Sequence, residues 1–169
     1  ISDIKMDISN ITKRSRKVAA QLSGGISHLL KKNKVHVFEG FGYLDKGTVD
    51  SKIIIIKTEK EIIRKKAQNV IIATGARSRN LPFVSSDGIN IWDYKTAMTP
   101  TKLPSSLIII GSGAIGMEFA SFYNDLGVNV TVVEALPSIL PNEDEDISKI
   151  VENNFKKRGM NIKTNATLK

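Results

Sequence analysis

The sequence predicts an α/β protein in which a long helix and an antiparallel β-meander precede half of a parallel, doubly wound sheet. Three observations lead to this class. Apolar residues recur at helical spacing over 10–32, alternating stretches broken by turn residues occupy 35–67, and strand and helix patterns alternate from 106 onward. The last pattern is typical of parallel strands that are joined by crossover helices.

The composition is that of an ordinary folded protein, because 41% of the residues are hydrophobic and 25% are charged. This balance excludes wholesale disorder and a collagen-like chain. Apolar runs such as 53–56 and 107–110 are far shorter than the roughly 20 residues that span a bilayer, so we expect no membrane partner. Cysteine is absent, which excludes disulfides, thiolate metal sites and thiol chemistry in these residues.

The net charge of +8 arises entirely in the first part of the chain. Residues 1–66 hold 15 basic and 7 acidic side chains, whereas 67–169 hold 10 of each kind. A basic nucleic-acid-binding or scaffold module is therefore the alternative from another functional class. Aromatic residues that could stack on bases are not interleaved with the basic clusters, so we expect a solvated lysine-rich surface and no nucleic-acid partner.

The first part of the chain is expected to hold one amphipathic helix and several strands. The helix covers 10–32, and its apolar stripe consists of Val18, Leu22, Ile26, Leu29 and Leu30. The predicted elements of the meander are a strand at 35–38, a hairpin over 43–58 with its turn at Lys46-Gly47, and a strand at 61–67. A strand at 69–73, apolar from Val70 to Ala73, follows and ends on Thr74-Gly75.

Residues 77–104 differ in character, because proline, glycine, serine and arginine punctuate them. Only one short helical turn is expected there, over 93–98, with Asp93 as its cap. We interpret this stretch as a linker and predict two domains, 1–104 and 105–169.

The second domain is predicted to alternate strands and helices. The expected elements are a buried strand at 106–110, a helix at 113–126, a strand at 128–134, a helix that begins at 144–146, and a strand at 160–163. Gly127 is the expected stop of the first helix. The acidic residues at 144–146 suit the start of the second helix, where the dipole favours negative charge.

A glycine-rich turn joins the first of these strands to the first helix, and its sequence is Gly111, Ser112, Gly113, Ala114, Ile115 and Gly116. Gly111 allows the tight turn, Gly113 lets the backbone approach a diphosphate, and Gly116 lets the helix pack closely on the sheet. The helix start would supply N–H groups and a positive dipole to phosphate oxygens. The spacing and its context predict a Rossmann-like dinucleotide-binding half-sheet.

Glu134 ends the second strand of this half-sheet, 23 positions after Gly111. A carboxylate at that place accepts hydrogen bonds from the hydroxyl groups of an adenosine ribose and repels a 2′-phosphate. No lysine or arginine occurs over 135–138, so NAD is favoured over NADP.

Two further candidates are weaker on physical grounds. Glu118 is expected in the first turn of the helix, where a carboxylate would complement the dipole. The sequence Ala73-Thr74-Gly75 ends an apolar strand, and its glycine would permit close approach of a ligand.

Taken in order, several segments resemble the pyridine nucleotide–disulfide oxidoreductase family, and within it the dihydrolipoamide dehydrogenase branch. The segments that carry the resemblance are 40–42, 70–76, 103–104, 108–121 and 126–134. The resemblance extends over the whole chain, and its specific part consists of 111–121 and 126–134.

The resemblance implies a set of cofactor contacts. Gly42, with Thr74, Gly75 and Ala76, would contact FAD as the later part of an FAD-binding domain. The glycine-rich turn, with Glu134, would hold NAD in the first half of an NAD-binding domain. Glu118 would lie near the nicotinamide and flavin rings.

The resemblance also implies an activity and partners. Such enzymes pass electrons from dihydrolipoamide through a dithiol and FAD to NAD, as homodimers that serve an acyltransferase complex carrying the lipoyl group. We therefore expect a cytoplasmic flavoenzyme. A related glutathione or mercuric reductase, or a flavin transhydrogenase, stays open as an alternative, because these enzymes differ mainly in other segments.

Parts of the family pattern are missing from these residues. The glycine motif for FAD and the CysxxxxCys pair do not occur, so the sequence is interpreted as a middle fragment without a catalytic residue of its own. We expect no bound FAD and no lipoamide turnover from it alone. His28 and His36 lack partners at catalytic or metal-ligand spacing, and no metal site is predicted.

Overall fold

The computed structural model describes residues 6–48 and 51–168. The chain divides into two compact units: one comprises 14–84, and the other comprises the described residues up to Lys13 together with 85–168. In sequence the division falls at 13/14 and 84/85, whereas the linker pattern placed one boundary after 104. The assignment of 1–104 and 105–169 to two cofactor domains remains a prediction.

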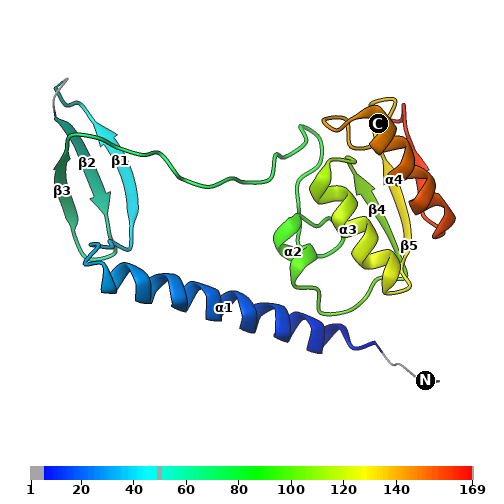
Figure 1. Cartoon of the computed structure of the whole chain (residues 1–169), viewed down its shortest axis with the longest axis horizontal. Helices are drawn as coiled ribbons and strands as arrows, with labels where there is room; N and C mark the ends of the chain where they lie inside the picture. Colours follow the sequence, from blue (N-terminus) through cyan, green and yellow to red (C-terminus); the bar gives the residue numbers. More distant parts are fainter. Residues whose placement is uncertain (1–5, 49–50, 169) are drawn as a thin grey trace. The chain divides into compact units, whose positions relative to one another are not determined.

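The first helix, α1, spans Ile8–Lys32 and confirms the predicted one (Figure 1). Asp7 caps its start, because its Oδ1 accepts hydrogen bonds from the N–H groups of Ser9 at 2.9 Å and Asn10 at 3.3 Å. Lys31 and Lys32 lie in the last turn, where positive charge complements the dipole. Most of the apolar stripe, including Leu22 and Ile26, is exposed in the described structure.

An antiparallel three-stranded sheet follows, in the order β1-β2-β3, and confirms the predicted meander. Its strands are β1 (Phe41–Asp45), β2 (Lys52–Lys57) and β3 (Ile62–Ala67). The hairpin closes later than predicted, since Thr48 and Ser51 exchange backbone hydrogen bonds beyond Lys46-Gly47. The residues between them, 49 and 50, lie outside the described ones.

Two predicted strands are wrong. Residues 35–38 and 69–73 are irregular, and neither segment pairs with any strand that the structure describes. Ile71 is 91% exposed. A strand of wholly apolar residues forms when neighbouring strands and helices cover both of its faces, and the described residues supply no such cover here.

The second unit contains a parallel sheet in the order β4-β5-β6, as the sequence predicts. Its strands are β4 (Ser106–Ile110), β5 (Asn129–Val133) and β6 (Asn161–Lys163). Helix α3 (Ala114–Asp125) connects β4 to β5, and α4 (Glu145–Lys157) connects β5 to β6 (Figure 1). This confirms the Rossmann-like half-sheet as a fold. Gly127, at φ +84°, follows α3 as the expected stop.

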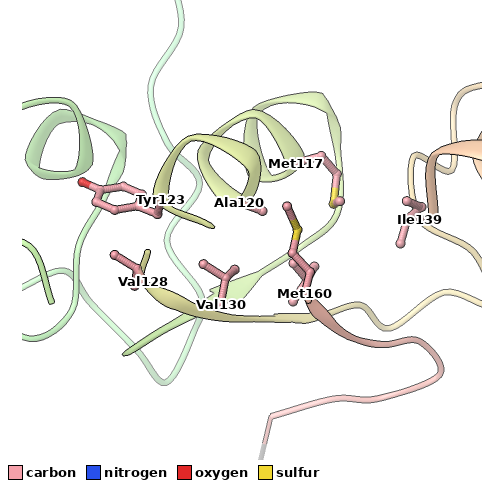
Figure 2. Packing of buried hydrophobic residues seen from close by; sticks show 8 residues of the cluster. Met117, Ala120, Tyr123, Val128, Val130, Ile139 and Met160 are labelled. Carbon is pink, nitrogen blue, oxygen red and sulfur yellow. The ribbon is translucent and has the colours of Figure 1, made fainter. Parts of the chain in front are cut away.

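The apolar core lies between α3 and one face of this sheet. Figure 2 shows Met117, Ala120 and Tyr123 of α3 facing Val130 of β5 and Met160. Val151 and Phe155 of α4 pack against the same cluster. Among the described residues, the buried members of this cluster are Met117, Ala120, Tyr123, Val128, Val130, Val132, Ile139 and Met160. The opposite face of β4 is open, because Ile108 is 63% exposed. The strand predicted at 106–110 is confirmed, but the prediction that it is buried is wrong.

A short helix, α2 (Tyr94–Met98), lies between the meander and the parallel sheet in sequence and packs with the second unit. Asp93 caps it as predicted, accepting from the N–H groups of Lys95 at 3.0 Å and Thr96 at 3.2 Å. The buried hydroxyl of Tyr123 donates to the carbonyl of Ala97 at 2.7 Å. Burial raises the pKa of Tyr123 to about 12, so this hydroxyl stays a donor at neutral pH.

Replacing Tyr123 tests how much its hydrogen bond to α2 contributes to the stability of the fold. Tyr123→Phe leaves the carbonyl of Ala97 without its donor, and we expect the free energy of unfolding to fall by about 1 kcal/mol. Urea unfolding measures the change. Tyr94→Phe is the matched control, and a loss as large in that variant would contradict the assignment.

Candidate functional site

The candidate site is the turn between the end of β4 and the start of α3. Gly111 adopts φ +94°, and its N–H donates to the carbonyl of Val133 at 2.9 Å, which ties the turn to β5. Gly113 is the residue that precedes the helix, with φ −64° and ψ 172°. Because it has no side chain, it makes no capping hydrogen bond to the helix. In contrast, Asp7, Asp93 and Asp144 cap α1, α2 and α4. The first N–H groups of α3 therefore have no side-chain acceptor within the described structure.

Two of the three glycines of the turn are required by the chain itself, each for a different reason. A Cβ on Gly116 would collide with the carbonyl oxygen of Gly111 and lie 3.3 Å from its carbon, so this glycine is needed for packing. Gly111 is needed for its left-handed conformation. A Cβ on Gly113 would meet no described atom within 4 Å. Neither packing nor conformation within the chain explains this glycine, and the space in front of it is open.

Glu134 lies beside this turn, just after β5, and is only 8% exposed. Its Oε2 accepts from the backbone N–H of Ser112 at 2.8 Å and from the Ser112 hydroxyl at 2.7 Å. Its Oε1 accepts from the N–H of Leu136 at 2.9 Å. The fold thus joins two predicted site residues, Ser112 and Glu134, that are 22 positions apart.

Opposing effects act on the pKa of Glu134. Burial raises it, but the hydrogen bonds from Leu136 and Ser112 favour the charged form more strongly, so the pKa lies below its ordinary value of 4.5. The carboxylate is therefore ionised at neutral pH.

A pH dependence of stability follows from this shift. Because the pKa of Glu134 is lower in the folded chain, its contribution is complete above about pH 4.5 and is lost as the pH falls through the folded value. We expect Glu134→Gln to flatten this acid-side decline in urea unfolding between about pH 3 and 6.

Asp87 supplies the control, since N–H groups of Ile91 and Ile89 lower its pKa in the same direction. Asp87→Asn should remove only the part of the acid-side decline in stability that is due to Asp87. An unchanged acid profile in Glu134→Gln would contradict the assignment.

Glu118 lies on α3 beyond the first turn, because the helix begins at Ala114. The expectation of a first-turn carboxylate is wrong. Its exposed side chain lines a depression of about 440 Å³ between α3 and α4. The other lining residues are mainly apolar: Ala114, Met117, Ser121, Leu140, Glu143, Ile147, Val151 and Phe155.

The predicted FAD-side residues belong to the other unit. Gly42 lies in β1 opposite Ile56, and Thr74, Gly75 and Ala76 lie in an exposed irregular stretch, with Gly75 at φ +76°. A Cβ on Gly42 or Gly75 meets no described atom within 4 Å. These residues form no cradle with the described residues of the unit.

The link between Ser112 and Glu134 was missed by sequence reasoning, which treated Ser112 only as a member of the turn. A hydroxyl residue between two glycines at the end of a strand was the available signal. His28 and His36 are both exposed. Residues 6–48 and 51–168 contain no cluster of three or more side chains suited to a metal ion. No helix in these ranges has the length and apolar character needed to cross a membrane.

Known proteins match this chain along almost its whole length. The sequence profile of the family described as pyridine nucleotide-disulphide oxidoreductase matches residues 2–169. The dihydrolipoyl dehydrogenases of Zymomonas mobilis and Rhizobium etli are 49% and 42% identical, each over 96% of this chain. The chain spans only 34% and 36% of these relatives, about a third of their length.

A solved structure agrees with the sequence relatives. The crystal structure of LpdA from Mycobacterium tuberculosis superposes with a TM-score of 0.88 at 33% identity, covering 98% of this chain and 37% of that one. Because the match covers 98% of this chain, it includes both the antiparallel and the parallel sheet. The chain therefore belongs to the pyridine nucleotide-disulphide oxidoreductase family.

Proposed function

We propose that the turn from β4 into α3 binds the diphosphate of NAD and that Glu134 faces its adenosine ribose. The observation that carries this proposal is the open space at Gly113, in front of a helix start that no described side chain caps. Such a helix start offers N–H groups and the positive end of a dipole to phosphate oxygens. A glycine without a packing role allows the backbone to approach the ligand closely.

The carboxylate of Glu134 supports NAD rather than NADP. It is ionised, lies within hydrogen-bond distance of the turn, and can accept from ribose hydroxyl groups. A 2′-phosphate at the same place would meet a like charge. No basic residue occurs over 135–138 to compensate for it.

We infer that this binding unit is part of an enzyme of the dihydrolipoyl dehydrogenase kind. The relatives at 49% and 42% identity are dihydrolipoyl dehydrogenases. They support dihydrolipoamide as the electron donor over the substrates of the glutathione and mercuric reductase alternatives. When bound, NAD would accept a hydride from reduced FAD. Glu118, exposed on α3, is the residue proposed to lie near the nicotinamide. We further propose a cytoplasmic homodimer that serves a lipoyl-bearing acyltransferase complex.

The FAD contacts proposed for Gly42 and Thr74 to Ala76 are supported by family membership alone. The described residues around them build no pocket, and 71–80 are exposed. We therefore expect the purified chain to retain no FAD and to turn over no lipoamide. A flavin absorption spectrum in that sample would contradict this.

Titration of NADH into the 169-residue chain tests the proposed function. We expect saturable binding, seen as a change in NADH fluorescence, with competition by ADP-ribose and weaker binding of NADPH. Absence of saturable NADH binding would overturn the proposal. A parallel titration with duplex DNA tests the other functional class, because an affinity that falls steeply with salt would favour the basic module.

A further inference from the structure

The carboxylate of Glu134 is nearly buried without a cationic partner. None of the ion pairs in the described part of the chain involves it. Lys163, on the adjacent strand β6, accepts the Glu134 N–H through its backbone carbonyl at 2.8 Å, and its side chain is exposed. Hydrogen bonds therefore hold the negative charge in place of an opposite charge.

These hydrogen bonds are distributed unequally over the two carboxylate oxygens. Oε2 accepts both hydrogen bonds from Ser112, whereas Oε1 accepts one from Leu136. A carboxylate oxygen has about two lone-pair directions, so Oε2 is filled, whereas Oε1 accepts one full hydrogen bond from Leu136 and the N–H of Ala135 contributes less. Oε1 is thus the oxygen with capacity for a further donor.

Ser112 is itself fixed from two sides. Its side chain is fully buried, at 0% exposed, so its hydroxyl is not in contact with solvent. Its backbone carbonyl accepts from the N–H of Leu140 at 2.9 Å. The hydroxyl is therefore committed to Glu134, and it restrains the orientation of that carboxylate.

We propose that Ser112 is a positioning residue that sets the preference for NAD over NADP by holding the carboxylate of Glu134 in one orientation. This inference rests on the proposed function. A fixed, fully charged carboxylate accepts from a ribose hydroxyl without first losing rotational freedom. The same fixed charge repels a 2′-phosphate, which a mobile or protonated side chain would repel less.

Removal of the hydroxyl tests this role. In Ser112→Ala we expect NADH affinity to fall about tenfold, because a hydrogen bond to a charged group is lost. NADPH affinity should fall less or rise, so the ratio of the two dissociation constants shrinks. Ser112→Cys keeps the shape with a weak donor, and its ratio should be intermediate.

Ser148→Ala is the matched control. Ser148 is also buried, at 2% exposed, and its hydroxyl donates to the carbonyl of Leu140 at 3.2 Å, away from Glu134. This variant loses a buried serine hydroxyl in the same unit. Its preference between NADH and NADPH should equal that of the unaltered chain.

A second readout does not depend on binding. Carbon-13 NMR of the Glu134 carboxyl in the ligand-free chain reports its titration directly. We expect Ser112→Ala to move the titration midpoint to higher pH and Ser148→Ala to leave it in place, since of these two serines only Ser112 donates to this carboxylate. Other charged groups near the turn, the exposed Lys163, Glu118 and Glu143, are the same in both variants.

The outcomes separate the two proposals. The positioning role is supported if Ser112→Ala, but not Ser148→Ala, shows a smaller preference for NADH over NADPH and a higher titration midpoint of the Glu134 carboxyl. An unchanged preference with intact NADH binding overturns the inference and leaves the proposed function standing. Failure of the unaltered chain to bind NADH overturns the proposed function and this inference together.

Discussion

Gly113→Val is expected to abolish NADH binding while leaving the chain folded. The open space at this position contains no described atom within 4 Å of a Cβ, so valine fits the protein but occupies the space proposed for the diphosphate. We expect NADH affinity to fall at least about 100-fold, roughly 2.7 kcal/mol. The loss of stability should stay at about 1 kcal/mol, because valine is a poorer residue than glycine before a helix.

Two measurements decide this prediction: NADH titration and urea unfolding of the same samples. Gly25→Val is the matched control, since Gly25 lies in α1, also has no described atom within 4 Å, and is far from the turn in sequence. That variant should bind NADH as the unaltered chain does. Tight NADH binding by Gly113→Val would show that the turn does not hold the diphosphate.

Gly116→Ala is expected to have the opposite pattern, in which the main loss is in stability. Its Cβ would overlap the carbonyl oxygen of Gly111, which is backbone and cannot rotate away. Overpacking of this kind costs about 1–3 kcal/mol, and we expect the upper end of that range. Alanine favours a helix interior by about 1 kcal/mol over glycine, which is too little to offset the collision.

Urea unfolding again measures the effect, and NADH binding should decline together with the folded population. Gly24→Ala is the control, because a Cβ there meets no described atom and the change should stabilise α1 slightly. An unchanged stability in Gly116→Ala would mean that α3 does not pack on the turn as closely as the structure describes.

Local sequence signals were sufficient for α2 and for the strands and helices of the parallel half-sheet. The helical period, the cap at Asp93, the stop at Gly127 and the acidic start of α4 each act over a few residues, so they predicted these elements without knowledge of their neighbours. The glycine spacing predicted the turn for the same reason. Two of its glycines have local requirements that no other residue meets equally well: Gly111 for its left-handed conformation and Gly116 for close packing.

Predictions that required a distant partner failed or were incomplete. The apolar stretch 69–73 has the composition of a strand, yet strand formation needs pairing that composition does not encode. Only half of the apolar residues of β4 are covered, because α3 and α4 pack against one face. In both cases the burial of a residue depends on the strands and helices that pack beside the segment. The periodicity of the segment itself does not predict those neighbours.

By itself, the sequence determined the family, the order of helices and strands in the parallel half-sheet, and the identity of the turn that faces open space. The tertiary structure alone decided that the carboxylate of Glu134 is held by Ser112 and Leu136. The physical reason is the parallel pairing of β4 with β5, which brings the ends of two strands together although 22 positions separate Ser112 from Glu134.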